Sequence, residues 1–298
     1  AYIFNVTSYH FSSMAYYATL TLNTIVWNYR VTMCLILFAY QHHSDYPLII
    51  AANRDEFFNR PATAAHYWPE SPEIFAGKDL QAGGTWMGVT RTGRFAAVTN
   101  HRSTHTPPNP AISRGALCTD FLRSNVSPQQ FLQEIGKNRL DYAGFNLLLG
   151  SPNQLLYYAN QTGDAVELKA GIHGLSNGVL NDSWPKVEQG KSALSAALAQ
   201  STEAEHLLHI LMDDNPADAS QVPDTGIGID AEIVLSSRFI PPINVRDNHY
   251  GTRNCTVLKI DRQNNSEWLE QAFSPDGKLG SRASHQIEGI TATNTTNN

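Results

Sequence analysis

The spacing of apolar residues along the chain predicts strands near both ends and helices in the middle. Short apolar runs bounded by turn residues are typical of strands. A tight turn at Arg91-Thr92-Gly93 makes its two flanking segments a β-hairpin. The strand segments predicted in this way are residues 34–40, 48–52, 83–90, 94–99, 145–149, 155–159, 255–260 and 267–270.

Helices are predicted over residues 114–123, 128–137 and 184–200. Ser127 is a good N-cap for the second of these, because Pro128 then stands at the first helical position. Ser201 is expected to cap a further helix, whose Leu207, Leu208 and Leu211 share the face that packs against a sheet. A loop is expected over residues 213–230. Strands on either side of a helical middle favour stacked antiparallel sheets covered by helices, which is an α+β layered fold.

The two ends of the chain differ from the rest in composition. Residues 1–32 hold one charged side chain, Arg30, and five of the 12 tyrosines. Polar residues interrupt every apolar run there, so neither a signal peptide nor a membrane helix is indicated. We expect residues 1–32 to be a loosely packed extension outside the native domain and residues 33–276 to form one domain. The polar tail, residues 277–298, is expected to be frayed.

The net charge and the cysteine content limit which binding partners and which cellular compartment are expected. A formal net charge of −6 disfavours nucleic acid and anionic membranes as partners. The three cysteines, Cys34, Cys118 and Cys255, cannot all pair, which favours reduced thiols and a cytoplasmic location. No metal-binding motif or dinucleotide fingerprint is present, and we expect neither a metal nor a cofactor. The expected partner is a small-molecule substrate or an apolar anionic ligand.

The dipeptide Met33-Cys34 suggests a specific chemistry. A cysteine that follows an initiator methionine becomes the first residue when that methionine is removed. Such a cysteine carries a nucleophile and a base together, because its thiol has a reference pKa of about 8.5 and its α-amine about 7.7–8.0. The simpler interpretation is a buried cysteine at the start of a strand.

Several motifs in order resemble those of the NRDE family, also called the transport and Golgi organisation 2 family. They run from Met33 to about Phe273, and the motif Asn53-Arg54-Asp55-Glu56 gives the family its name. They are Met33-Cys34, Asn53-Arg54-Asp55-Glu56, Gly83-Gly84-Thr85-Trp86, Gly144-Phe145-Asn146-Leu147, Leu175-Ser176-Asn177, Trp184-Pro185-Lys186 and Tyr250-Gly251-Thr252-Arg253.

That family is more distantly similar to N-terminal nucleophile hydrolases of the penicillin V acylase and bile-salt hydrolase type. The similarity implies a four-layer αββα sandwich of two antiparallel sheets, and hydrolysis of linear, non-peptide amides by an N-terminal cysteine. It implies that Cys34 is the nucleophile and that Asp55 holds its α-amine. Asn177 would line the oxyanion hole, with Asn100 beside it. These residues are expected to converge on one cleft.

The active-site arginine is less clear from the motifs. Arg253 is the first choice, although Arg238 lies in a sequence that is closer to the hydrolases' local pattern. Arg54 is expected at the rim of the cleft, where its planar guanidinium would suit a substrate carboxylate. Trp86 would wall an apolar acyl pocket. Each of these residues also has an ordinary structural interpretation, as a salt bridge, a turn or part of the core.

Two classes of function therefore stay open. The first is a cysteine-dependent amide hydrolase. The second is a non-catalytic protein that handles haem or acyl-CoA and other lipids, since the resemblance links eukaryotic members to Golgi organisation and protein secretion.

Overall fold

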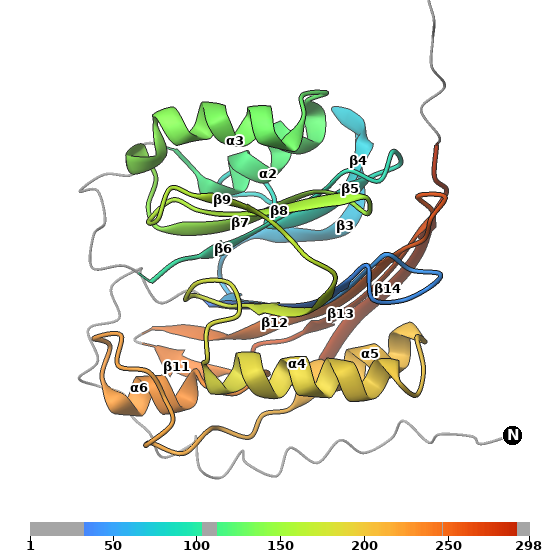
Figure 1. The fold of residues 1–298 in the computed structure, drawn as a ribbon. Coiled ribbons are helices and arrows are strands. Elements are labelled where there is room, and N and C mark those ends of the chain that lie inside the picture. Colours follow the sequence, from blue (N-terminus) through green and yellow to red (C-terminus); the bar gives the residue numbers. More distant parts are fainter. Residues whose placement is uncertain (1–32, 103–111, 246, 291–298) are drawn as a thin grey trace, which may run out of the picture.

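Two antiparallel sheets lie face to face between two layers of helices in the computed structural model, which describes residues 33–102, 112–245 and 247–290 (Figure 1). This arrangement confirms the predicted four-layer αββα sandwich. The expectation that residues 1–32 are loosely packed lies outside the described residues.

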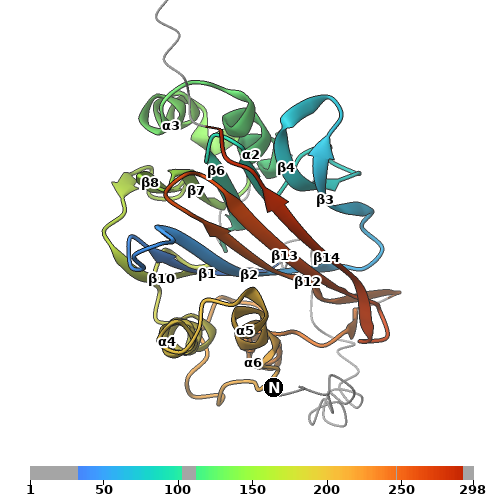
Figure 2. The same ribbon diagram turned by 90° about the vertical axis from the view of Figure 1, so that its right-hand side faces the viewer.

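The first sheet contains the first two strands and the last five, so it joins the two ends of the described chain. Its order is β10-β1-β2-β12-β13-β14, with β11 paired to β12. All of its pairings are antiparallel, and Figure 2 shows β12, β13 and β14 running side by side. The strands are β1 (Cys34–Tyr40), β2 (Leu48–Phe57), β10 (Gly171–Leu175), β11 (Ile243–Val245), β12 (Asn248–Ile260), β13 (Ser266–Phe273) and β14 (Leu279–Ile287).

The second sheet is a meander in which each strand pairs with the next one along the chain. All of its pairings are antiparallel too. Its strands are β3 (Ala62–Trp68), β4 (Ser71–Asp79), β5 (Met87–Thr90), β6 (Phe95–Asn100), β7 (Phe145–Ser151), β8 (Gln154–Ala159) and β9 (Ala165–Glu167).

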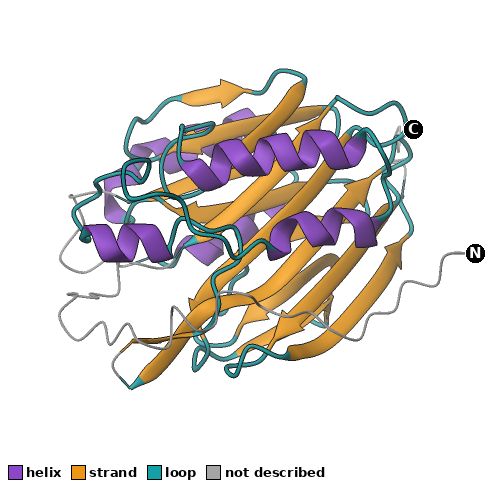
Figure 3. Ribbon diagram, turned by 90° about the horizontal axis from the view of Figure 1, so that it is seen from below, coloured by secondary structure: helices purple, strands orange, loops and turns teal. Residues whose placement is uncertain are grey.

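The helices cover the outer faces of the two sheets (Figure 1). Helices α2 (Arg114–Arg123) and α3 (Pro128–Lys137) lie on the second sheet, and a 3-10 turn, η1 (Arg139–Asp141), follows them. Seen from below, the helices of the first sheet lie across its strands (Figure 3). They are α4 (Pro185–Leu198), α5 (Ala204–His209), η2 (Ile210–Met212) and α6 (Ile229–Val234).

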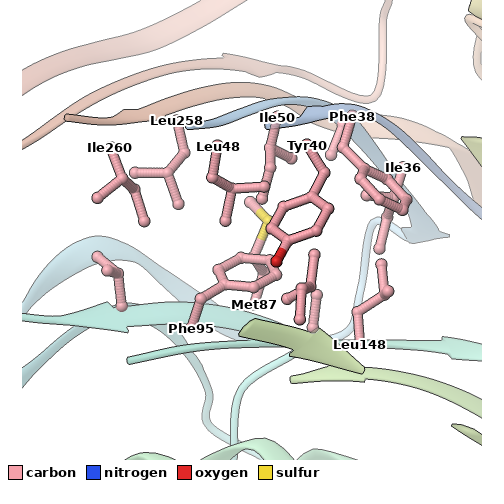
Figure 4. Close-up of a cluster of buried hydrophobic side chains, with 14 of the residues drawn as sticks. Ile36, Phe38, Tyr40, Leu48, Ile50, Met87, Phe95, Leu148, Leu258 and Ile260 are labelled. Carbon is pink, nitrogen blue, oxygen red and sulfur yellow. The ribbon is translucent and has the colours of Figure 1, made fainter. Parts of the chain in front are cut away.

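The alternation of side chains along β1 explains why that strand is apolar throughout. Successive side chains of a strand point to opposite faces of the sheet. Ile36 and Phe38 therefore pack between the two sheets, against side chains such as Phe95 and Leu148 (Figure 4). Leu35 and Leu37 face the other way and pack under α4 and α5. A strand buried on both faces shows no polar alternation in its sequence.

Most of the predicted elements are confirmed, and two expectations were wrong. Helix α2 has the predicted bounds, and Ser127 caps α3 by accepting a hydrogen bond from the backbone N–H of Gln130. The helix expected to start at Ser201 instead begins at Ala204, with Glu203 at its N-cap. Residues 279–287 of the expected frayed tail form β14, which pairs with β13. This strand lies at the edge of the sheet and most of its side chains are exposed, so its apolar signal is weak.

A close approach of two backbones explains the glycine at position 84. A Cβ atom on Gly84 would lie 2.5 Å from the carbonyl carbon of Gly115, at the start of α2. Atoms of a rigid backbone cannot give way to that extent. Gly84 therefore lets α2 lie directly against the segment that leads into β5.

We predict that Gly84→Ala lowers the free energy of unfolding by about 1–3 kcal/mol, the usual range for overpacking a tight interior. Gly136 of α3 is the matched control, because a Cβ there would meet only the Tyr158 hydroxyl, at 3.9 Å. Gly136→Ala should be neutral or stabilising, since alanine is the better helix former. Urea denaturation of both variants checks this. Equal effects at the two positions would contradict it.

Candidate active site

Cys34 begins β1, with β10 on one side and β2 on the other. It pairs with Arg54 of β2, and its side chain lies on the same face as Ile36, toward the second sheet. The β1–β10 register matches Ile36 with Leu175, so its continuation places Asn177 level with Cys34. The Ser176 hydroxyl donates a hydrogen bond of 2.9 Å to the Cys34 carbonyl, which fixes that position. The thiol therefore stands in a row between Asn177 and Arg54.

Asn177 is fully buried and connects the two sheets at this end of β1. Its side-chain Nδ2 donates to the carbonyl of Asn100, the last residue of β6, at 2.7 Å. The backbone N–H of Arg102 donates to the Asn177 carbonyl, also at 2.7 Å. The Thr99 hydroxyl donates to the Ser176 carbonyl at 2.7 Å. These bonds hold the amide of Asn177 in a fixed orientation beside Cys34.

Asp55 follows Arg54 on β2, so its side chain points to the opposite face of the sheet, toward the helices. It is 1% exposed, and its Oδ1 accepts a hydrogen bond of 2.7 Å from the Thr252 hydroxyl. Its backbone N–H donates to the carbonyl of Met33 at 3.2 Å. Burial raises the pKa of the Asp55 carboxyl, and the positive charge of Lys186 is the largest effect that opposes this shift.

Met33 is built into the fold just before the cysteine. Its backbone N–H donates to the Tyr250 hydroxyl at 2.7 Å, and its side chain is 1% exposed. The Met33 side chain packs in a small apolar cluster with residues of α6, β11, β12 and the segment between α6 and β11. They are Val234, Leu235, Ile240, Ile243, Val245 and Tyr250. While Met33 is present, the nitrogen of Cys34 is an amide and accepts no proton.

The thiol of Cys34 is not activated in this form of the chain. Burial, and after it the negative charge of Asp55, raises the pKa of the Cys34 thiol to about 12. The thiolate is the nucleophile, so a thiol with this pKa reacts slowly at neutral pH.

Arginines lie near the Cys34 end of β1. Arg253 occupies a β-bulge in β12, and its guanidinium donates to the Arg60 carbonyl and, at 3.4 Å, to the Phe57 carbonyl. A bulge turns a side chain away from the regular alternation of the strand. The charge of Arg253 interacts there with the charges of Arg54 and Glu56. Arg114, at the first position of α2, is close enough for its charge to interact with Cys34 and Glu56. The charges of Arg54 and Arg114 therefore act on the Cys34 thiol, whereas Arg253 interacts with Arg54.

Two of the predicted substrate residues, Arg238 and Trp86, have side-chain contacts of a structural kind. The Arg238 guanidinium donates to the Ile210 carbonyl at 2.7 Å and pairs with Asp213 at 2.6 Å, within the helical layer. It therefore holds the loop after η2, and the choice between the two arginines favours Arg253. Trp86 is partly buried and packs against the inter-sheet core and the core under α2 and α3. Its contacts support the ordinary interpretation of Trp86 as part of the core.

Sequence reasoning assigned no role to three residues that the fold brings to this region. Lys186 and Tyr250 belong to motifs that carried the family resemblance, so their presence in those motifs was an available signal. Arg114 belongs to none of the quoted motifs. Only the packing of α2 against the second sheet places it near Cys34.

Comparison with known proteins identifies the family. The family model for Transport and Golgi organisation 2 matches residues 33–275, so the chain belongs to this family. It is 32% identical over 259 residues to the human Transport and Golgi organization protein 2 homolog, covering 81% of this chain and 93% of that protein. The mouse homolog is 31% identical over 263 residues, with the same coverage of each chain. The Drosophila melanogaster protein is 25% identical over 271 residues, again with the same coverage.

Solved structures give weaker likenesses. The chain is similar to a mutant of conjugated bile acid hydrolase from Clostridium perfringens, with a TM-score of 0.41 and 9% identity over 89% of this chain and 100% of that chain. It is also similar to an N-acylethanolamine-hydrolyzing acid amidase ortholog from Caenorhabditis elegans, with a TM-score of 0.42 and 10% identity over 75% of this chain and 92% of that chain. These values are too low to transfer residue roles.

The helices of the described residues are all too short or too polar to cross a membrane.

We predict that Cys34 of a chain retaining Met33 is alkylated by iodoacetamide at a rate that rises about tenfold per pH unit from pH 7 to pH 10, without a plateau. The raised pKa keeps the thiol neutral over this range, so the thiolate fraction grows with every unit. Peptide mass spectrometry of quenched samples gives the rate. The control is the same chain in urea, where the profile should level off above a pKa of about 8.5. A plateau below pH 9 in the folded chain would contradict the predicted environment.

Proposed function

We propose that the protein is a cysteine-dependent hydrolase of linear amide bonds whose working form begins at Cys34. The observation that carries this proposal is the position of Cys34 at the head of β1, between Asn177 and Arg54, with Asp55 directly beside the Met33–Cys34 peptide bond. This position supplies a nucleophile, a base and an oxyanion donor to one substrate carbonyl once Met33 is removed.

The reaction follows from these positions. The free α-amine of Cys34 takes the proton of the thiol, and the thiolate attacks the amide carbonyl carbon to form a C–S bond. The resulting oxyanion accepts a hydrogen bond from the side chain of Asn177. The C–N bond then breaks as the α-ammonium returns its proton to the departing amine. Water, deprotonated by the α-amine, hydrolyses the thioester, releases a carboxylic acid and restores the thiol.

The charges near Cys34 favour a substrate with an anionic group. The charges of Arg54 and Arg114 act on the thiol, and Arg253 interacts with Arg54. The guanidinium groups of Arg114 and Arg253 bond to backbone carbonyls. Two carboxylates lie close by: Asp55, on the opposite face of the sheet, and Glu56, whose Oε2 lies 3.9 Å from the Arg54 guanidinium. Guanidinium groups suit carboxylate, sulfonate and phosphate oxygens because their donors form a planar fork. The proposed substrate is therefore an N-acyl amide with an acidic group.

Binding without chemistry is the second candidate function. One observation favours it: in the chain that retains Met33, the Cys34 nitrogen is an amide and the thiol pKa is about 12. The arginines would still bind an apolar anion in that form.

The first function is tested with a chain that begins at Cys34, assayed against a panel of acidic N-acyl amides. We predict that Cys34→Ala abolishes turnover, and that Asn177→Ala lowers kcat/KM by about 10²–10³ because one oxyanion donor is lost. Cys118→Ala is the matched control, since Cys118 is buried in the core under α2 and should not affect the rate. Thermal melting checks that each variant is folded.

The two candidate functions give different results in this experiment. Turnover that survives Cys34→Ala would refute the hydrolase. Tight binding of an acidic acyl compound that is unchanged by Cys34→Ser, with no turnover by the unsubstituted chain, would establish the binding function instead.

A further inference from the structure

Lys186 is buried in an unfavourable place. It is 2% exposed, and its Nζ has no hydrogen-bond partner among the described residues. It also stands at the second position of α4, after the N-cap Trp184. The partial positive charge of a helix N-terminus repels a cation there. A lysine that is desolvated, unbonded and at the wrong end of a helix points to a role other than stability.

Asp55 is the natural counterpart of this lysine. Its Oδ1 is occupied by Thr252, whereas its Oδ2 is buried and also lacks a hydrogen-bond partner among the described residues. The charges of Asp55 and Lys186 interact, but their side chains form no ion pair in the described structure. Two buried atoms of opposite charge are thus each left without a hydrogen bond. Buried polar atoms without partners are uncommon and call for an explanation.

The peptide bond between Met33 and Cys34 suggests which group would bond to the unpaired Asp55 oxygen. The carbonyl of Met33 accepts a hydrogen bond from the backbone N–H of Asp55, so the Met33–Cys34 bond lies against this residue. Removal of Met33 leaves the α-amine of Cys34 at this point. A neutral amine donates N–H bonds and offers one lone pair. It would donate to the unbonded Asp55 carboxylate oxygen, close to a positive charge.

The other ionisable groups around Lys186 are either ion-paired or neutral. Arg102 pairs with Glu232 of α6 at 2.7 Å, and both side chains are buried. The Tyr250 hydroxyl accepts the N–H of Met33, and burial raises the pKa of this phenol well above its usual value, so it stays neutral. Cys34 is a neutral thiol in this form. Asp55 and Lys186 therefore decide the charge that the α-amine would meet.

We propose that Lys186 is a positioning residue that balances the charge of Asp55 and so keeps the α-amine of Cys34 in its neutral, proton-accepting form. This inference rests on the proposed function, because it concerns a chain that begins at Cys34. A lone buried carboxylate beside the amine would hold it as an ammonium, which cannot take the thiol proton. The lysine charge opposes that protonation and leaves Asp55 free to orient the amine.

The test measures the α-amine directly, in a chain that begins at Cys34 and carries ¹⁵N-labelled cysteine. We expect Lys186→Met to raise the titration midpoint of the amine by about one pH unit, a tenfold change, since a neighbouring like charge is removed. Lys186→Arg should keep the midpoint near that of the unsubstituted chain. If substrate turnover is present, the acid limb of the kcat/KM profile should move upward with Lys186→Met by the same amount.

Lys259→Met is the matched control. Lys259 is also buried, but it pairs with Glu267 of β13 at 2.7 Å and donates to the Thr202 carbonyl. Its loss should leave the midpoint of the amine in place. A midpoint unchanged by Lys186→Met, or shifted equally by Lys259→Met, would overturn the proposal.

Stability separates this role from a structural one. In a chain that retains Met33, Lys186→Met should not lower the melting temperature, because the buried Nζ has no hydrogen bond to lose among the described residues and the cost of burying the charge is removed. Failure of the variant to fold in both forms would assign Lys186 a structural role and overturn the proposal. A shifted midpoint in a protein that hydrolyses no amide would leave this inference standing and refute the proposed function alone.

Discussion

The pairing of β1 between β10 and β2 is the constraint on which the whole site depends. The two registers place Asn177, Cys34 and Arg54 in one row across the first sheet. A shift of one residue would turn every side chain of β1 to the opposite face. Such a shift is strongly opposed, because β1 buries Phe38 between the sheets and Leu37 under α4. The core on both sides of the sheet therefore fixes the direction of the thiol.

The two faces of the first sheet divide the proposed chemistry. The thiol of Cys34 and the side chain of Arg54 lie on the face toward the second sheet. Asp55 and Lys186 lie on the face toward the helices. These two sets meet only where β1 begins, at the nitrogen of Cys34. A nucleophile placed one residue further along the strand would carry an amide nitrogen instead of the free α-amine that serves as its base, which explains why the cysteine must stand at the head of the strand.

Buried polar residues fix the segment that carries Asn177. Asn146 of β7 donates to the Gly178 carbonyl at 2.8 Å, and Thr99 of β6 donates to the Ser176 carbonyl. Each of these bonds satisfies a group that would be unfavourable to bury alone. Together they hold the loop after β10 against the second sheet, so the site is built from both sheets. This construction favours a fixed orientation of the Asn177 amide, which oxyanion stabilisation requires.

Most of the layer arrangement and part of the candidate site could be predicted from the sequence. β1 and β7 were clear as short apolar runs, and α3 was clear from its cap and its period. β14 was missed because most of its side chains are exposed. Cys34, Asp55 and Asn177 followed from the order of motifs, whereas Arg114 did not. The choice between Arg253 and Arg238 stayed open because local sequence does not show that the Arg238 guanidinium pairs with Asp213 in the helical layer.

The most direct test of the account is to trap the acyl intermediate. A chain that begins at Cys34 is mixed with an acidic N-acyl amide and quenched in acid, and the intact mass and the modified peptide are measured. The account predicts one added acyl group, carried by Cys34, and none on an otherwise identical chain that retains Met33. Equal acylation of the two chains, or hydrolysis with the acyl group on another residue, would contradict it.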